Sequence, residues 1–356
     1  ASLGPAAPFG DTALEWLGAA DRPPTWGANI RVAVLDSGVR SHPALAGVPI
    51  RSIDLIGGGG NGDYSGHGTA VASLLAGSAG GIYGVAPGVE IFDIRVLDGS
   101  GIGDSFSLAT GILRAADMGA QVITLSLGTY GDSPLLRDAI NYALSKNIAV
   151  VAAAGNEGYA NLSYPARYPG VIAVGAVDAT GTIAPFSNSG ERLAIVAPGT
   201  AITAAWLDGR AIAFSGTSAA VPLAGGAIAY VLADQRSLSP AAATDIVLQN
   251  ANETGPPGAD PAYGQGTLDL ERLSQRRTMG LHDLAVASHW IYASDAGAQG
   301  AIPVQVTVQN RGTVTESYSI LTVTDGRSTR RFTLPSLDPG TTATSVFHLD
   351  PSGGDS

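Results

Sequence analysis

Three side chains that could together cleave an amide bond lie far apart in the chain. Ser218 lies among small residues, where the short apolar run 211–214 gives way to a segment rich in alanine and glycine. His67 lies between two glycines just before an amphipathic segment, and Asp36 ends an apolar run. A serine hydroxyl can attack a carbonyl carbon, an imidazole can take and return the proton, and a carboxylate can orient the imidazole. These residues predict nucleophilic catalysis without a metal or cofactor.

The position of Ser218 suits a group that develops negative charge. Residues 219–232 are small or apolar for about four turns, so Ser218 begins a predicted helix. The free N–H groups and the dipole at a helix N-terminus favour an anion. Asn156 follows an apolar run and can point an N–H donor into the same cleft, although an asparagine there can also simply form a turn.

Asp36 and the histidines each have a plainer interpretation. A carboxylate at the C-terminal end of a parallel strand lies where open α/β sheets place their sites, but aspartate also caps turns. A general base near neutral pH is usually histidine, and only His42 and His67 precede residue 280. His42 is followed by proline in a turn, and we interpret it as structural. His67 is therefore the predicted base, and activity should rise with pH as its imidazole becomes neutral.

Alternating strands and helices are expected to bring these residues together. From about residue 30 to 275 the chain alternates apolar runs with amphipathic segments, a rhythm typical of parallel sheets. Because the apolar runs are continuous, helices should cover both faces. We therefore predict an α/β fold in which helices flank a parallel β-sheet on both faces. The predicted strands are 30–35, 89–96, 121–125, 148–153, 171–177 and 195–199, and the predicted helices are 107–118, 134–146, 219–232, 240–249 and 268–273.

The pattern changes after residue 280. Segments such as 304–308 and 319–323 alternate apolar and polar residues, and about five such runs are present. This predicts a small all-β sandwich of immunoglobulin-like kind, although a full sandwich usually has about seven strands. We divide the chain into a catalytic domain (1–275), a linker (276–281) and a β-sandwich module (282–350).

Composition narrows the possible partners but does not fix the compartment. The 356 residues carry a formal charge of −11 with a pI of about 4.7, which argues against nucleic acid and anionic membranes as partners. The absence of cysteine excludes disulfides, thiolate catalysis and cysteine-ligated zinc. No basic segment followed by an apolar one opens the chain, and we find no apolar run of about 18 residues. We expect a soluble chain, or one already processed.

Four segments, in this order, resemble the subtilisin-like serine proteases. Asp36-Ser37-Gly38, Gly66-His67-Gly68-Thr69 and Gly216-Thr217-Ser218-Ala219 are similar to the three catalytic signatures of that family, and Ala154-Gly155-Asn156 is similar to its oxyanion segment. The order Asp, His, Ser is also the order in subtilisin. The resemblance runs from about residue 16 to residue 273. Any one signature could arise by chance, but four at compatible spacing could hardly do so.

The resemblance implies a role for each of these residues. Ser218 would be the nucleophile, His67 the base and then the acid, and Asp36 the group that orients the imidazole. Asn156 would donate to the oxyanion together with the N–H of Ser218. Two edge strands would bind an extended peptide through main-chain hydrogen bonds. The residues implied to bind substrate are Gly99, Ser100, Gly101, Ser126, Leu127, Gly128, Ala153, Gly155, Glu157, Ser163 and Thr217.

The predicted S1 pocket has small and apolar walls. Leu127, Ala153, Gly155 and Ser163 would line it, with Glu157 at the rim. These residue types favour a medium or large apolar P1 side chain, and Glu157 could admit a basic one.

The positions that usually hold calcium in this family are not matched. Ala44 stands where an aspartate ligand is often found, Ala79-Gly80-Gly81 lacks the usual asparagines, and Arg192 and Ala194 replace acidic ligands of a weaker site. Hard cations need several oxygen ligands. We therefore predict no metal ligand by residue, although backbone carbonyls or Asp63 could build a different calcium site. The chemistry itself requires no cofactor.

We expect a secreted serine endopeptidase in mature form that acts on extended polypeptides. It should be a monomer of broad specificity, with its own propeptide as a transient inhibitor. One alternative is a processing protease of narrow specificity that the sandwich recruits to a partner. Another is a catalytically silent binding protein in which the sandwich is the functional part. The sandwich would serve stability, adhesion or substrate capture.

Overall fold

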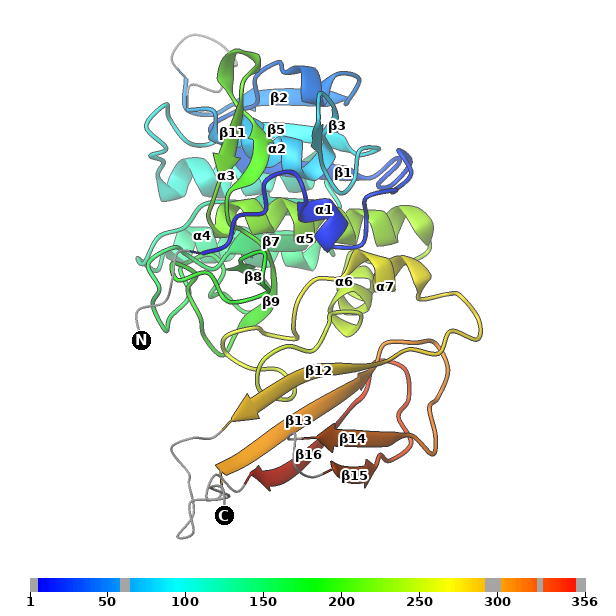
Figure 1. Ribbon diagram of the computed structural model, residues 1–356. Helices are drawn as coiled ribbons and strands as arrows, with labels where there is room; N and C mark the ends of the chain where they lie inside the picture. The colour runs from blue at the N-terminus through cyan, green and yellow to red at the C-terminus, as the bar shows by residue number, and fades with distance from the viewer. Residues whose placement is uncertain (1–5, 58–64, 292–301, 325–328, 350–356) are drawn as a thin grey trace.

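A seven-stranded parallel sheet forms the centre of the chain. The structure is a computed structural model that describes residues 6–57, 65–291, 302–324 and 329–349. The strand order is β2-β5-β1-β6-β7-β8-β9, and each neighbouring pair is parallel (Figure 1). The strands are β1 (Arg31–Asp36), β2 (Ile50–Asp54), β5 (Glu90–Arg95), β6 (Val122–Leu125), β7 (Ala149–Ala153), β8 (Ile172–Val177) and β9 (Leu193–Pro198).

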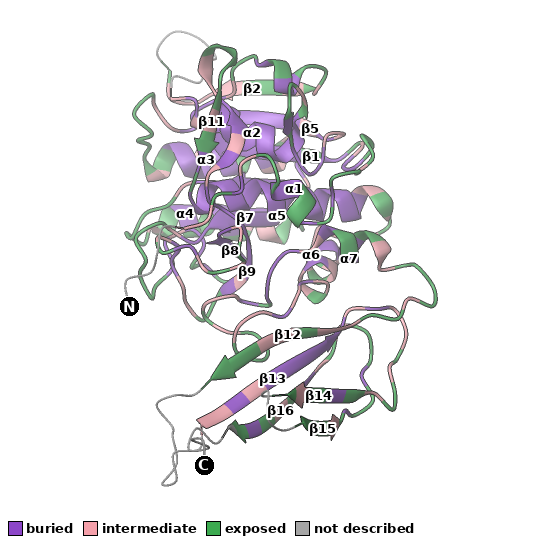
Figure 2. Cartoon of the chain, viewed as in Figure 1, coloured by how far each residue is buried: buried purple, intermediate pink, exposed green. Residues whose placement is uncertain are grey.

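Helices bury both faces of this sheet. In β1, Val32 and Val34 pack in the apolar cluster that contains α2 and α5, whereas Ala33 and Leu35 pack in the cluster that contains α3 and α4. Alternate side chains of a strand point to opposite faces, which explains why the central strands are buried along almost their whole length (Figure 2). The helices are α1 (Ala13–Trp16), α2 (His67–Ala76), α3 (Ser105–Asp117), α4 (Pro134–Ser145), α5 (Thr217–Asp234), α6 (Pro240–Gln249) and α7 (Leu270–Gln275).

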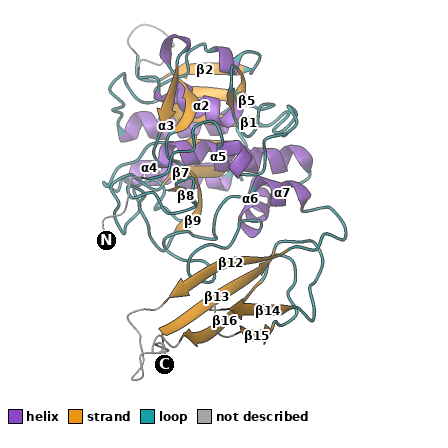
Figure 3. Cartoon of the chain, viewed as in Figure 1, coloured by secondary structure: helices purple, strands orange, loops and turns teal. Residues whose placement is uncertain are grey.

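Smaller elements complete this part of the chain. Two short hairpins flank the sheet, and two single turns of 3-10 helix lie in the connections (Figure 3). They are β3 (Ser78–Ala79) with β4 (Ile82–Tyr83), β10 (Ile202–Ala205) with β11 (Ala211–Phe214), η1 (Pro43–Leu45) and η2 (Leu207–Gly209).

Helix α5 lies closest to the sheet. A Cβ atom on Gly225 would come within 2.7 Å of Thr124 Cγ2, and one on Gly226 within 2.8 Å of Val85 Cβ, so glycine permits this contact. By length and composition α5 could cross a membrane, but 89% of that stretch is buried inside the fold. The sequence prediction that no such apolar run exists is therefore wrong, and the run forms a core helix.

The predicted fold class is confirmed. The sheet is parallel and covered on both faces, and most predicted strands and helices agree with the structure to within two residues. Four strands were not predicted: β2, β3, β4 and β10. Strands β3 and β4 are two residues long each and form a hairpin. Strand β2 lies at the edge of the sheet and carries polar residues, and β10 directly follows the turn after β9.

The C-terminal part is all-β, as predicted. Strands β12, β13 and β16 form one antiparallel sheet, and β14 and β15 form a hairpin. One apolar cluster joins both sheets and includes Val306 of β13, Leu321 of β14 and Phe347 of β16. Its immunoglobulin-like kind and the domain boundaries stay predictions, and residue 350 lies outside the described residues. The strands are β12 (Leu284–Ile291), β13 (Ile302–Asn310), β14 (Ile320–Thr324), β15 (Thr329–Thr333) and β16 (Thr342–Leu349).

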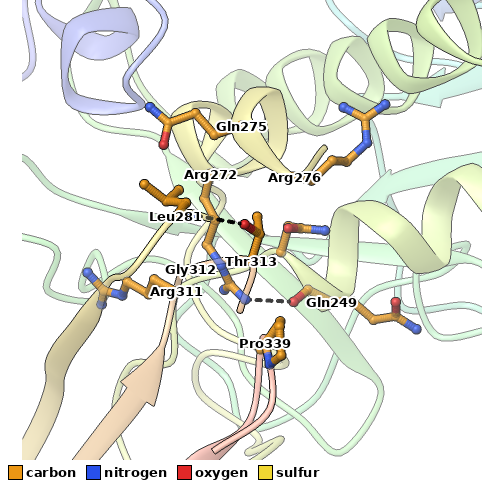
Figure 4. Close-up of a pocket in the computed structure, with 11 residues that line it drawn as sticks. Gln249, Arg272, Gln275, Arg276, Leu281, Arg311, Gly312, Thr313 and Pro339 are labelled. Carbon is orange, nitrogen blue, oxygen red and sulfur yellow. Dashed lines mark hydrogen bonds between the residues drawn. The ribbon is translucent and has the colours of Figure 1, made fainter. Parts of the chain in front are cut away.

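Polar contacts join β13 to the segment that follows α6, and Arg272 of α7 bonds to the same part of the chain. The Gln309 side chain accepts from Glu253 N at 3.0 Å and donates to Ala251 O at 3.2 Å. The Arg272 guanidinium donates to Ala251 O at 2.6 Å and to Gln249 O at 3.3 Å. A polar pocket of about 230 Å³ lies beside them, lined by Arg272, Arg276, Arg311 and Pro339 among others (Figure 4).

Candidate active site

A buried carboxylate holds the imidazole of His67. Asp36 is the last residue of β1 and is fully buried, and its Oδ1 atom accepts from Ser37 N and from His67 Nδ1, each at 2.7 Å. Because an ionised carboxylate only accepts, the proton of this pair lies on Nδ1 and Nε2 is left as the basic nitrogen. The His67 side chain is 28% exposed and can therefore be reached from solvent.

Two serines fix the beginning of α2 next to Asp36. Ser65 Oγ donates to Ser37 Oγ at 2.8 Å and accepts from His67 N at 3.3 Å. Ser37 Oγ accepts from Gly68 N at 3.1 Å. The Phe214 ring meets the imidazole edge to face, with centroids 5.2 Å apart. The histidine is thus held from its backbone and from one face of its ring.

Ser218 lies in the first turn of α5, beside the end of β6. Pro222 has no N–H, so it cannot bond to the carbonyl of Ser218 four residues earlier. Ser126 Oγ donates to that carbonyl instead, at 3.0 Å. In return, Ser218 Oγ donates to Ser126 O, also at 3.0 Å. The nucleophile predicted from the sequence is therefore tied to one of the segments predicted to bind substrate.

The amide of Asn156 has a defined orientation. Its Oδ1 atom accepts from Thr217 N at 2.8 Å and from Thr217 Oγ1 at 3.0 Å. A backbone N–H can only donate, so the atom that faces it must be the amide oxygen. The Nδ2 group consequently lies at the other end of the amide and can donate elsewhere. Thr217 Oγ1 also accepts from Gly155 N at 3.3 Å.

The five residues predicted for S1 surround one pocket. Its volume is about 380 Å³, and its lining also includes Asn156 and Thr217. Ser163 closes part of it, with its hydroxyl bonded to Ala153 O at 3.1 Å. The predicted residues that line it are Leu127, Gly128, Ala153, Gly155, Glu157 and Ser163, together with Thr129 and Tyr130, which were not predicted.

A hydrogen-bonded carboxylate forms the rim of this pocket. Glu157 Oε2 accepts from Tyr130 Oη, from Asn188 Nδ2 at 3.1 Å and from Asn156 N at 2.9 Å. Burial opposes the ionisation of Glu157, but these donors outweigh it and lower the pKa of the carboxyl group. Burial, and then the bond to Glu157, raise the pKa of Tyr130 to about 12. The rim is therefore an anionic carboxylate beside a neutral phenol.

The two predicted substrate-binding segments flank a second pocket of about 610 Å³. Gly101, Leu127 and Gly128 line it, but neither segment is a regular strand. Residues 99–101 form a turn in which Asp98 Oδ1 accepts from Ser100 N at 2.8 Å. Among the described residues, the backbone of Leu127 and Gly128 forms no hydrogen bond, so it remains open to a ligand. The two edge strands implied by the resemblance are therefore wrong for both segments. The Asp98 carboxylate caps a turn at 99–101, and 126–128 lies just past the end of β6.

A family comparison agrees with this geometry. The model of the subtilase family, Peptidase_S8, matches residues 27–266. The chain belongs to the subtilase family. The match ends before the C-terminal strands, which lie outside it.

Individual relatives of this subtilase are proteases. A thermostable alkaline protease of Halalkalibacterium halodurans is 37% identical over 261 residues, which cover 70% of this chain and 69% of that protein. Subtilisin Savinase of Lederbergia lenta is 37% identical over 249 residues, covering 69% and 90%. The structure of sphericase matches with a TM-score of 0.67 and 32% identity, covering 76% and 99% of the two chains. The structure of the prenylagaramide maturation protease PagA matches with a TM-score of 0.63 and 30% identity, and the match covers 74% of this chain and 98% of that chain.

These matches confirm the predicted class of enzyme. The chain is a subtilisin-like serine endopeptidase, a hydrolase that needs no cofactor for its chemistry and acts on polypeptides. The roles of individual residues stay predictions that the geometry makes specific.

The positions that often hold calcium in subtilases do not fit a cation here. Ala44 is fully buried in an apolar cluster with Ile82 and Ala205. The segment 79–81 is the tight turn of the β3–β4 hairpin. Within the described ranges, no three acidic or histidine side chains group as metal ligands. Asp63 lies outside the described residues.

Three residues at the site were not predicted from the sequence: Thr129, Tyr130 and Asn188. Asn188 and Tyr130 both contact the Glu157 carboxylate. Asn188 lies in a Ser-Asn-Ser-Gly run that reads as an ordinary turn, and Tyr130 follows the segment 126–128 by two residues. No sequence spacing shows that these loops meet, so the fold was needed to find them.

Proposed function

We propose that this subtilase cleaves peptide bonds by acyl transfer, with Ser218 as nucleophile, His67 as general base and acid, and Asp36 as the orienting carboxylate. The observation that carries the proposal is the 2.7 Å bond between Asp36 Oδ1 and His67 Nδ1. It supports a fixed tautomer whose Nε2 atom can accept the serine proton.

Substrate binding would also prepare the nucleophile. Ser218 Oγ donates to Ser126 O, and its proton would have to point to His67 Nε2 when the oxygen attacks. A substrate N–H that binds the Ser126 carbonyl would displace the hydroxyl from this acceptor. The hydroxyl would then donate to His67, attack the scissile carbonyl and form the acyl-enzyme. Protonated His67 would return the proton to the leaving amine, and a water molecule would complete hydrolysis by the same route.

The oxyanion of the tetrahedral intermediate would bind at the beginning of α5. Asn156 Nδ2 is the donor end of an amide whose oxygen is fixed by Thr217. The Ser218 N–H and the dipole of α5 would supply further stabilisation. Donors held in this way need no reorganisation as the negative charge develops.

The substrate would be an extended polypeptide. Its main chain would bind the open backbone of Leu127 and Gly128, and its P1 side chain would enter the 380 Å³ pocket. The small and apolar walls favour an apolar P1 residue, while the anionic Glu157 rim admits a basic one and repels an acidic one. A P1-varied peptide library in which Asp or Glu is cleaved fastest would contradict this assignment.

The remaining parts of the proposal concern the setting of the enzyme. We place it outside the cell, as a monomer, with its own propeptide as a transient inhibitor and with neither nucleic acid nor membrane as a partner. The charge of −11 supports the exclusion of anionic partners.

Labelling by a fluorophosphonate tests the proposed chemistry. A covalent adduct on Ser218 of the full chain, absent from Ser218→Ala, is the expected result. Labelling should rise with pH as the His67 imidazole loses its proton, since only the neutral form accepts the serine proton. An unlabelled wild-type chain, or an adduct at another serine, would exclude the proposed nucleophile.

A processing protease of narrow specificity is the second candidate. It is favoured by the likeness to the maturation protease PagA and by the C-terminal strands, which lie outside the family match. Digestion of casein alongside short peptides separates the two candidates. Broad cleavage of casein supports the first, whereas intact casein with one peptide cut at a single bond supports the second.

A further inference from the structure

A buried asparagine links the proposed oxyanion loop to the rim of the S1 pocket. Asn188 is 1% exposed and lies between β8 and β9. Its Oδ1 atom accepts from Tyr159 N at 2.8 Å and from Glu157 N at 3.2 Å. Its Nδ2 group lies 3.2 Å from Ala154 O and 3.1 Å from Glu157 Oε2. One side chain thus bonds to the loop 154–159 on both sides of Asn156.

The two backbones reinforce this arrangement. Asn188 N donates to Gly155 O at 3.0 Å, Gly158 N donates to Phe186 O at 2.7 Å, and Ser189 N donates to Tyr159 O at 2.9 Å. Gly155 has a φ of +114°, and a Cβ atom there would lie 2.1 Å from Asn188 Nδ2. The Asn188 amide therefore occupies the space that a side chain at position 155 would need.

The amide also fixes the carboxylate that supports Asn156. Glu157 Oε2 accepts from both Asn188 Nδ2 and Asn156 N. Asn188 Nδ2 lies 2.7 Å from Tyr130 Oη, which itself donates to Glu157. Asn156 is exposed at the tip of this loop, so its position depends on these contacts and on Thr217.

We propose that Asn188 is a positioning residue for the reaction, which holds the loop 154–159 so that Asn156 Nδ2 faces the developing oxyanion. Asn188 acts through Asn156 and through no direct contact with substrate. The inference rests on the proposed function, because it presumes that Asn156 donates to the oxyanion.

A double-mutant cycle between Asn188 and Asn156 tests the proposal. The variants are Asn188→Ala, Asn156→Ala and the double variant, and kcat and KM are measured on a peptide p-nitroanilide with an apolar P1 residue. We expect Asn156→Ala to lower kcat by about 10²–10³-fold, the scale known from subtilisin for this donor. Asn188→Ala should lower kcat by about 10–100-fold, because a small misplacement of a catalytic group is costly. KM should change little.

The double variant distinguishes positioning from general support of the fold. If Asn188 acts through Asn156, its loss should lower kcat by less than about two-fold in the Asn156→Ala background. The proposal is overturned by losses that multiply in the double variant, or by an unchanged kcat in Asn188→Ala. An unchanged kcat in Asn156→Ala itself would instead refute the oxyanion role within the proposed function.

Asn310→Ala provides a matched control. Asn310 is also fully buried, at the end of β13, and its amide donates to Val314 O and Leu337 O at 2.8 Å and accepts from Gly312 N at 2.9 Å. Its removal should lower the melting temperature about as much as Asn188→Ala while kcat stays within two-fold. Equal losses of kcat in both variants would mean that unfolding, and not positioning, explains the effect.

Asn188→Asp keeps the test valid if the alanine variant does not fold. Aspartate has the same shape and keeps the acceptor for Tyr159 N, but it places a carboxylate oxygen near Glu157 Oε2. Two carboxylates at this separation share a proton at low pH and repel each other at high pH. The ratio of wild-type to variant kcat should therefore rise from pH 6 to pH 9. A ratio that does not change with pH would count against the proposal.

Discussion

The α/β region (α1 to α7) and the C-terminal β region (β12 to β16) carry buried polar groups differently. In the α/β region, Asp36 Oδ2, Asn252 Oδ1, Asp260 Oδ2 and Arg272 Nε are buried with no hydrogen-bond partner among the described residues. Asp36 lies at the active site. Asn252, Asp260 and Arg272 lie near the junction of the two regions, where Gln309 of β13 bonds to residues 251 and 253. In the described part of the C-terminal β region no such atom is found.

The thickness of the two cores explains this difference. The parallel sheet is covered on both faces, and its two apolar clusters draw on nearly every helix and strand of the region. The C-terminal β region has one small cluster between a three-stranded sheet and a hairpin. An unsatisfied buried polar group costs about 1–3 kcal/mol. The burial energy of a large core can offset the cost of such groups, and one of them, Asp36, lies at the active site. A small core cannot offset that cost.

The largest expected effect is the loss of activity in Asp36→Asn. The asparagine would present an N–H group to His67 Nδ1 and favour the wrong tautomer, so kcat/KM on a peptide p-nitroanilide should fall by about 10⁴-fold. The melting temperature should fall slightly, because the same amide nitrogen would also face the N–H of Ser37, which donates to Oδ1 in the parent. The exposed Asp138→Asn serves as control. A variant that keeps more than a tenth of the activity would contradict the assigned orienting role.

The next effect should appear in the C-terminal β region. Phe347 is buried in the single cluster of this region, with its ring 6.0 Å from that of Phe332. Phe347→Ala should lower the free energy of unfolding of this region by about 3–5 kcal/mol. In a Ser218→Ala background, calorimetry of Phe347→Ala should show this region melting at a lower temperature than in the parent. In the active enzyme, Phe347→Ala should leave the rate of short-peptide cleavage within two-fold of the parent.

The exposed neighbour Val346 offers the control for this variant. It lies on the same strand with 54% of its surface exposed, so Val346→Ala should change stability by less than about 0.5 kcal/mol. If peptide cleavage were lost together with the C-terminal β region, the two regions would form one cooperative unit and the comparison between them would be wrong.

The two regions also differ in how much the sequence predicts. The continuous apolar run before Asp36 predicted β1 to within one residue, because a strand buried on both faces has a simple pattern. The small residues around Ser218 and His67 predicted reactive side chains at element ends, and the structure brings Asp36 and His67 into contact. Local pattern was sufficient wherever one strand or helix end positions one residue.

Contacts between loops could not be predicted in this way. Asn188 and Gly155 are 33 positions apart by sequence number, and Gln309 bonds to a segment more than 50 residues earlier. Such pairs depend on where the sheet places each loop, and no periodicity records that. The family resemblance implied a strand at 99–101, but the Asp98 side chain caps a turn there, which competes with extended backbone.

The free energy of unfolding should depend on pH through Glu253, which lies where the two regions meet. Glu253 is 6% exposed, and burial together with the nearby Asp260 raises its pKa to about 7, even though Gly258 N donates to it at 3.1 Å. The folded chain therefore binds more protons than the unfolded chain between about pH 4.5 and 7. The stabilisation that protonated Glu253 gives the folded chain is complete below this pH range and is lost as the pH rises through it.

Glu253→Gln removes this dependence while it keeps an acceptor for Gly258 N. Solvent access to the loop reduces the effect, so we expect the variant to be more stable than the parent by about 1–2 kcal/mol at pH 8.5 and no more stable at pH 4. Urea unfolding in the Ser218→Ala background measures this difference. The exposed Glu191→Gln should show none, and a Glu253→Gln difference that is the same at both pH values would refute the assignment.

The smallest expected effect concerns the contact that joins the two regions. Gln309 is 4% exposed, and its amide bonds to Ala251 O and Glu253 N across the junction. In Gln309→Ala the Ala251 carbonyl keeps its bond from Arg272. Glu253 N and Arg311 Nε both lose Gln309 Oε1 as acceptor, but the half-buried Arg311 can turn to solvent, so the cost in unfolding free energy should be about 1 kcal/mol. Because the lost bonds couple the regions, their melting transitions should separate in calorimetry even though each core is unchanged. The exposed Gln265→Ala should leave the calorimetric trace as it is. A Gln309→Ala trace that shifts as one peak would mean that apolar contact, and not this amide, couples the C-terminal β region to the α/β region.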